Sequence, residues 1–145
     1  MTQEEKDLLL KDLCARLDTN LVCSIYRTDD EGVGYRDEIL HGYCKGDIWY
    51  EFYFREDCSI GIDNVSKIKP YLFPLSSMTE EQKEFIKNKF CYDWDIDDHP
   101  YSLLAYCIGI GDMDELIDWF HENHFDYRGL IPMGLANDAT GLNIY

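Results

Sequence analysis

Apolar and polar positions follow a helical period at the start of the chain and a strand-like pattern after it. Residues 3–17 carry an apolar stripe behind a capping-box pair, Thr2 and Glu5, so we expect a first helix there. Four later stretches have the alternation or composition of strands: 21–27, 36–43, 48–54 and 59–62. Short turns separate them, which favours an antiparallel meander of three to five strands packed by the N-terminal helix.

Helical patterns dominate the second half of the chain. Pro70 and Pro74 favour an extended connector over residues 69–75. A capping-box spacing of Thr79 and Gln82 predicts a helix over 80–89, and an apolar run over 101–108 favours another. We therefore expect an α+β fold with a mostly helical C-terminal half, in a single globular domain spanning the 145 residues.

The stretch 111–136 contains the clearest amphipathic helix. Asp112 and Glu115 have the capping-box spacing, and apolar residues then recur every three or four positions up to Phe120, which we expect in the core. His124 extends the same stripe. The apolar residues that follow are expected to fold back onto the core: Leu130, Ile131, Met133 and Leu135.

Charge is distributed unevenly along the chain, whose net charge is −16. Residues 1–89 hold 12 basic and 18 acidic side chains, whereas residues 90–145 hold one basic and 11 acidic ones. Such a surface repels nucleic acid and anionic lipid, and favours a basic protein partner. The partner-binding residues expected from this are Asp93, Asp95, Asp97, Asp98, Asp114 and Asp118. Acidity that serves solubility alone is the alternative.

Two histidines offer a metal site. His121 and His124 lie three residues apart, with Asp118 and Asp126 near them, which is compatible with zinc. A structural role is the alternative, because a histidine suits the C-terminal end of a helix. The aspartates at 93–98 lack the glycine and glutamate that an EF-hand loop needs. We expect no metal and no other cofactor.

Two further features have competing interpretations. Arg128 is the only basic residue after Lys89, and we expect a structural ion pair with Asp126 or a neighbouring carboxylate, an anion site being the alternative. Trp49 and Tyr53 lie on one face of a predicted strand, as a second core layer or an exposed aromatic patch.

The six cysteines show no C-x-x-C pair, and the N-terminus has no basic region followed by a long apolar one. No apolar run is long enough to span a bilayer. We therefore expect reduced thiols, with disulfides as the alternative, in a cytoplasmic protein that does not enter a membrane.

Several strings in the chain are similar to those of a known group. They are CARL at 14–17, KPYL at 69–72, SSMTEEQ at 76–82, HFDYRGLI at 124–131 and GLA at 134–136. They resemble a family of small uncharacterised proteins of gut anaerobes and their mobile elements, which implies an accessory protein of a mobile element or its host and no particular chemistry. A fainter likeness, from His99 to Ile117, is to one ankyrin repeat.

These observations favour an intracellular protein-interaction module whose acidic C-terminal surface engages a basic partner. One concrete form is a mobile-element accessory that modulates a protein handling nucleic acid. The alternative is a small metal-binding protein or enzyme that uses His121, His124 and nearby carboxylates. The sequence favours the first, and it does not indicate an oligomeric state.

Overall fold

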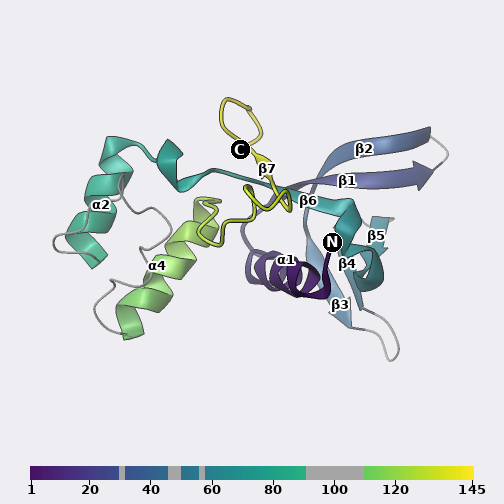
Figure 1. The fold of residues 1–145 in the computed structure, drawn as a ribbon, viewed down its shortest axis with the longest axis horizontal. Helices are drawn as coiled ribbons and strands as arrows, with labels where there is room; N and C mark the ends of the chain where they lie inside the picture. The colour runs from purple at the N-terminus through teal and green to yellow at the C-terminus, as the bar shows by residue number, and fades with distance from the viewer. Residues whose placement is uncertain (30–31, 46–49, 56–57, 91–109) are drawn as a thin grey trace.

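The computed structural model describes residues 1–29, 32–45, 50–55, 58–90 and 110–145 (Figure 1). Three α-helices occur in these ranges: α1 (Gln3–Ala15), α2 (Glu80–Phe90) and α4 (Ile110–Glu122). The strands are β1 (Val22–Asp29), β2 (Gly32–Ile39), β3 (Gly42–Lys45), β4 (Tyr50–Arg55), β5 (Cys58–Gly61), β6 (Ile68–Leu72) and β7 (Asn137–Asp138). Two 3-10 helices, η1 (Ile62–Lys67) and η2 (Leu75–Ser77), flank β6. The α+β class is confirmed.

Two of the three predicted capping boxes are present. The Glu5 N–H donates to the Thr2 hydroxyl at 3.2 Å, and the Thr2 N–H donates to the Glu5 carboxylate at 2.6 Å. Thr79 and Gln82 make the same pair of bonds before α2, at 2.9 and 3.2 Å. The prediction at Asp112 was wrong, because α4 begins at Ile110. Asp112 therefore lies inside the described part of α4 and does not precede it.

The larger sheet has the strand order β2-β1-β6-β7. The β1 and β2 strands form an antiparallel hairpin, and β6 pairs antiparallel with the other side of β1. The prediction of a connector over residues 69–75 was wrong for residues 69–72, because these belong to the strand β6. Proline has no N–H to donate to a neighbouring strand. Pro70 is tolerated because, although it pairs with Cys23 of β1 on one side, the short parallel pairing with β7 on the other side begins only at Tyr71.

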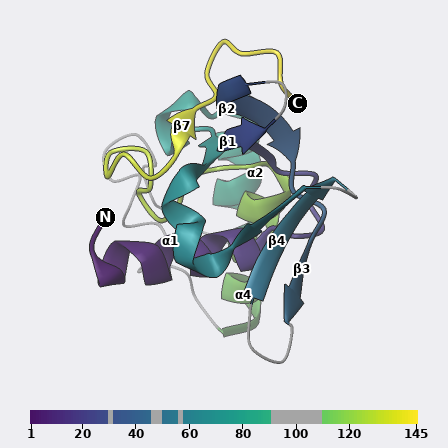
Figure 2. The ribbon, with the colours of Figure 1, turned by 90° about the vertical axis from the view of Figure 1, so that its right-hand side faces the viewer.

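The smaller sheet is antiparallel and has the order β3-β4-β5. The predicted single meander is thus two sheets, whose described strands number more than the three to five expected. Figure 2 shows β7 and the β3–β4 pair on opposite sides of the molecule, with β1 between them. The chain passes between the sheets at residues 40–41, where the N–H groups of Leu40 and His41 donate to the carbonyls of Leu21 and Tyr53.

The buried apolar side chains form two clusters. In the first, Leu9 and Leu13 of α1 pack with the strands, which confirms that the N-terminal helix covers a sheet. The second lies between α2 and α4 and includes Phe120, whose exposure is 0%. The core prediction for Phe120 is therefore confirmed. Of the tail residues expected to fold back, Leu130 and Leu135 join the first cluster and Ile131 packs against it, but Met133 is exposed.

The C-terminal half is helical only in part where it is described. After α4 the chain runs through turns and the two-residue strand β7 to Tyr145. The predicted helix over 101–108, and most of the ankyrin-like segment, lie outside the described residues, so a mostly helical C-terminal half stays a prediction. In the described ranges, none of the helices has the length and apolar character needed to cross a membrane.

Candidate interaction site at the end of helix α4

Helix α4 ends in a Schellman motif built around His124. The Phe125 N–H donates to the Phe120 carbonyl at 2.9 Å, and the His124 N–H donates to the His121 carbonyl at 3.1 Å. His124 has a φ of 56°, the left-handed conformation that this position usually gives to glycine. For a residue with a side chain that conformation costs roughly 1–2 kcal/mol. Contacts made by the histidine ring must therefore offset the strain.

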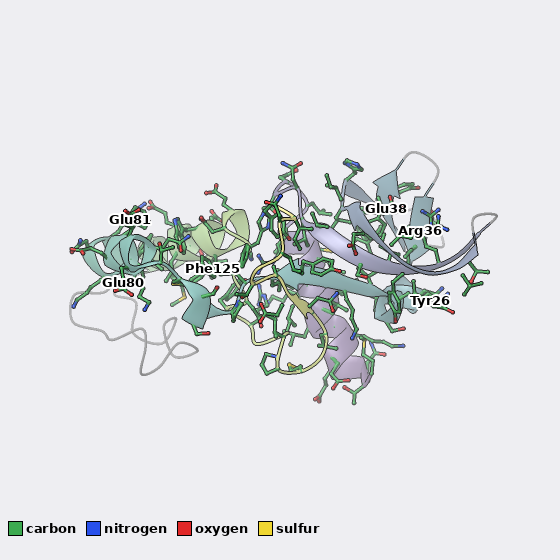
Figure 3. All side chains as sticks on the ribbon, turned by 90° about the horizontal axis from the view of Figure 1, so that it is seen from above. Tyr26, Arg36, Glu38, Glu80, Glu81 and Phe125 are labelled. Atoms are coloured by element: carbon green, nitrogen blue, oxygen red, sulfur yellow. The ribbon has the colours of Figure 1, made fainter. Side chains whose placement is uncertain are left out.

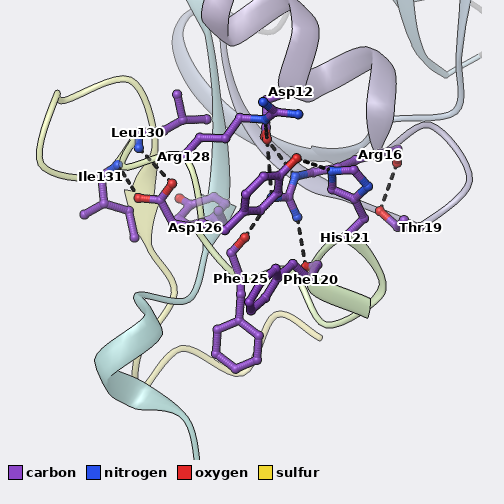
Figure 4. A network of polar contacts seen from close by, with 12 residues as sticks. Asp12, Arg16, Thr19, Phe120, His121, Phe125, Asp126, Arg128, Leu130 and Ile131 are labelled. Carbon is purple, nitrogen blue, oxygen red and sulfur yellow. Dashed lines mark hydrogen bonds and ion pairs between the residues drawn. The ribbon is translucent and has the colours of Figure 1, made fainter. Parts of the chain in front are cut away.

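Arg16, just after α1, holds this helix end in place (Figure 4). Its side chain is completely buried. The guanidinium donates to the Asp12 carboxylate at 2.8 Å from Nε, to the Phe120 carbonyl at 3.3 Å and to the Phe125 carbonyl at 2.7 Å. It thus supplies a donor to the Phe125 carbonyl and a second donor to the Phe120 carbonyl, which also accepts the Phe125 N–H, and it fixes the turn relative to α1.

Arg128 completes the ion-pair network. Its Nε donates to Asp12 Oδ1 at 3.1 Å, and its guanidinium lies over the Tyr127 ring, 4.6 Å from the centroid. The predicted structural ion pair is therefore present, but its partner is Asp12 and not Asp126. The Asp126 carboxylate accepts bonds from the N–H groups of Leu130 and Ile131, at 2.7 and 2.8 Å, because the chain turns sharply there.

We expect Asp126→Asn to lower the free energy of unfolding by about 1–2 kcal/mol. The amide keeps one oxygen to accept a backbone N–H but presents its NH2 group to the other. Burial raises the pKa of Asp126, so part of the charged bond energy is already lost to desolvation. Urea denaturation measures the change. An equally stable variant would show that the turn does not depend on the carboxylate.

The two histidines are buried and make different contacts. His121 Nε2 and the Tyr127 hydroxyl share a hydrogen bond at 2.8 Å. The His124 ring stacks on Tyr145, with centroids 3.8 Å apart and planes 12° from parallel. Burial, followed by the nearby Arg16 charge, lowers the pKa of both histidines to about 4. Both rings are therefore neutral near pH 7.

His124 Nδ1 is buried and has no hydrogen-bond partner among the described residues. A neutral imidazole whose Nε2 carries the proton offers Nδ1 as an acceptor. An unpaired acceptor in the interior costs free energy. Because this atom is buried, a bound group could donate a hydrogen bond to it only if the ring turned.

A metal site gains no support from these contacts. Over the described ranges no group of three or more histidine, cysteine or acidic side chains is placed to hold an ion. His121 Nε2 is engaged by Tyr127, and both oxygens of Asp126 are engaged by backbone amides. The metal-binding alternative stays an untested prediction, with no arrangement of side chains in its favour.

A cleft of about 440 Å³ lies where the end of α4 meets the start of α2. Its aromatic walls come from Phe73, Phe125 and Tyr145, and its polar lining includes Glu122 and His124. The other lining residues are Ser77, Thr79, Gln82 and Asn123. Tyr145 is fixed because its hydroxyl donates to the Tyr71 carbonyl at 2.6 Å and accepts from the Val22 N–H at 3.3 Å.

A row of exposed carboxylates on α4 leads to this cleft. Asp114, Asp118 and Glu122 are all exposed and lie four residues apart, so they share one face of the helix. Glu115, beside them, pairs with Lys89 of α2 at 2.9 Å. Of the predicted partner-binding residues, the structure thus places Asp114 and Asp118 on one surface. The other four lie outside the described residues: Asp93, Asp95, Asp97 and Asp98.

Several of these residues were not predicted from the sequence. Nothing in the sequence around Tyr145 or Glu122 indicated that they would line a cleft. Arg16 did give a signal, because it lies three residues after Leu13 on the apolar face of α1, where a charged residue needs a buried partner. Trp49 lies outside the described residues, and Tyr53 is half-buried, so neither interpretation of that strand face is decided.

Comparison of this chain with protein-family models, with curated proteins and with solved structures gives no match.

Proposed function

We propose that the protein is an interaction module that binds a basic protein partner through the acidic face of α4. The observation that carries this is the row formed by Asp114, Asp118 and Glu122, which ends in the cleft. Like charges four residues apart destabilise a helix by about 0.2–0.5 kcal/mol per pair. The α4 sequence contains no lysine or arginine to offset them. A basic partner would relieve this repulsion.

The resemblance in sequence supports a more specific form of the proposal. In this form the partner handles nucleic acid, its basic surface being one that nucleic acid would otherwise occupy, and both proteins act in the cytoplasm. The aspartates at 93–98, which lie outside the described residues, stay part of the predicted partner-binding set. Because charge of one sign speeds the encounter with an opposite charge, association is expected to be strongly salt-dependent.

Neutralising the row tests the proposal. The triple variant Asp114→Asn, Asp118→Asn and Glu122→Gln is expected to associate several-fold more slowly than the wild-type protein with a lysine- and arginine-rich peptide at low salt. At high salt the difference in association rate is expected to be smaller. Stopped-flow fluorescence measures the rate. The same change of charge on α1 and in the turn after it gives the matched control, with the exposed residues Glu4, Asp7 and Asp18 made neutral. The association rate of this control variant is expected to fall much less than that of the triple variant.

A second exposed surface separates the outcomes further. Tyr26, Val33, Tyr35 and Ile39 are exposed on one face of the β1–β2 hairpin. Figure 3 shows Tyr26 at the opposite end of the molecule from Glu80 and Glu81 of α2. If Tyr35→Ser slows association while the triple variant matches its control, the partner binds the hairpin and the proposal for α4 is wrong.

A further inference from the structure

We infer that the cleft at the end of α4 binds the guanidinium group of an arginine side chain presented by the basic partner. The inference rests on the proposed function and makes it more specific. It names the chemistry that the cleft accepts, and the carboxylate row supplies the longer-range attraction. Four features of the cleft favour arginine. They are its aromatic lining, the negative charge of that lining, the unpaired His124 Nδ1 and the carboxylate that neutralises the neighbouring Arg16.

The walls suit a flat cation. Phe73 lies 6.2 Å from Phe125 and 5.8 Å from Tyr145, measured between ring centroids, so three aromatic rings of the lining lie close together. A guanidinium placed on such rings gains roughly 0.5–2 kcal/mol from their negative faces. It is also less strongly hydrated than an ammonium group, so it loses less on leaving water.

The charge of the lining favours a cation over an anion. Among the described residues that line the cleft, Glu122 alone is charged. The cleft also lies at the C-terminal end of α4, which carries the negative end of the helix dipole. On the α2 side, Thr79 and Gln82 already bond each other's backbone N–H groups. The first turn of α2 also carries Glu80 and Glu81. An anion would therefore meet acidic side chains here and no lysine or arginine.

His124 supplies a second acceptor once its ring turns toward the ligand, because Nδ1 is buried and has no partner among the described residues. The residue is 8% exposed, lines the cleft and leaves Nδ1 without a partner. A guanidinium has five N–H donors in one plane, so it can bond the Glu122 carboxylate and a second acceptor together. An ammonium group has fewer donors and no flat face to stack. The cleft is therefore expected to prefer arginine to lysine.

Arg16 lies at this end of α4, and its charge would repel a second cation. Its charge is offset because Asp12 receives its Nε at 2.8 Å and its Nη2 at 3.4 Å. Arg128 is bonded to the same carboxylate, and the Asp126 carboxylate lies in the same turn. The two arginines are thus matched by two carboxylates, and Glu122 is left to balance the charge of the ligand.

Short peptides test the cleft apart from the rest of the surface. The probes are three peptides of glycine and serine with one central residue: arginine, lysine or citrulline, which keeps the shape of arginine without its charge. We expect the arginine peptide to bind at least about five-fold more tightly than the lysine peptide, and the citrulline peptide to bind more weakly than both. Titration calorimetry gives the affinities. On binding, the ¹⁵N shift of His124 Nδ1 is expected to move, because this atom gains a donor.

Two variants provide a matched comparison. Glu122→Gln is expected to weaken binding of the arginine peptide by about five-fold or more. Asp114→Asn, two turns away on the same face, is expected to change the affinity for this peptide by less than about two-fold. Both residues are exposed, so neither change is expected to disturb folding.

The outcomes separate this inference from the function on which it rests. Equal affinities for the arginine and lysine peptides, or an unmoved His124 signal, would overturn the inference. If the long basic peptide then still binds with the expected salt dependence, the proposed function stands without it. Loss of salt-dependent binding in the wild-type protein would instead remove the proposed function, whatever the short peptides do.

Discussion

Replacing Arg16 with methionine is expected to lower the free energy of unfolding by about 3–5 kcal/mol, the loss typical when one partner of a buried ion pair is removed. Methionine has a similar length and fills much of the same space, so the change tests the charge and the hydrogen bonds more than the packing. Guanidinium chloride unfolding, followed by tryptophan fluorescence, measures the loss.

The size of the effect follows from what the guanidinium holds together. Arg16 bonds Asp12, whose side chain is also fully buried, and the carbonyls of Phe120 and Phe125. Without Arg16 the Phe125 carbonyl loses its side-chain donor, and an unsatisfied buried group costs about 1–3 kcal/mol, whereas the Phe120 carbonyl still accepts the Phe125 N–H. Arg128 continues to neutralise part of the Asp12 charge through its 3.1 Å bond. The loss is therefore expected toward the lower end of the range.

A surface ion pair provides the control. Lys89 and Glu115 also join two helices, at 2.9 Å, but their side chains are 48% and 64% exposed. Lys89→Met is expected to cost less than about 1 kcal/mol, because water screens the pair and solvates the remaining charge. A similar loss for both variants would contradict the view that burial makes Arg16 important. So would a loss below about 1 kcal/mol for Arg16→Met.

The features that the sequence predicted well depend on residues that are close along the chain. The capping boxes at Thr2 and Thr79 need a partner only three residues away, so the spacing contains nearly all of the information. The strand predicted over 21–27 and the buried face of α4 follow from periodicity in the same way, whereas the strand predicted over 36–43 was wrong, because the chain leaves one sheet for the other at residues 40–41. At Asp112 the same rule failed, because the helix continues upstream to Ile110 and a capping box requires the chain to be extended before it.

The features that the sequence did not predict depend on contacts between distant segments. Arg16 meets the end of α4 across more than 100 residues, and β6 receives β7 from the last part of the chain. Pro70 favoured a connector because proline rarely lies within a sheet. It is tolerated in β6 because β7 is short and pairs only with the residues after Pro70, which the sequence did not indicate. The cleft likewise needs Tyr145 beside His124, a pairing that no local spacing indicates.

Acidification from pH 7 to 4.5 is expected to destabilise the protein through His121 and His124, by roughly 2–3 kcal/mol for each histidine. The folded state lowers the pKa of both residues to about 4, chiefly through burial and then through the charge of Arg16. Unfolded histidines have a pKa near 6.5. Between these values the unfolded chain binds protons that the folded protein does not, so unfolding becomes more favourable as the pH falls.

The direction and the pH window distinguish the histidines from the carboxylates. Their stabilisation is fully present above pH 6.5 and is lost progressively down to about pH 4. Asp126 acts in the opposite direction at the acidic end, because burial raises its pKa and the folded protein then takes up its proton before the unfolded chain does. Loss of stability between pH 6.5 and 5 is therefore the part that belongs most clearly to the histidines.

Two measurements check this assignment. Urea unfolding at steps of half a pH unit is expected to show a positive slope of stability with pH between 5 and 6.5, and the variant His121→Asn with His124→Asn is expected to lose most of that slope. NMR titration of the imidazole protons follows each of the two sites directly. If His121 and His124 titrate near the unperturbed value of about 6.5, burial does not hold them neutral, and the acid sensitivity must come from other groups.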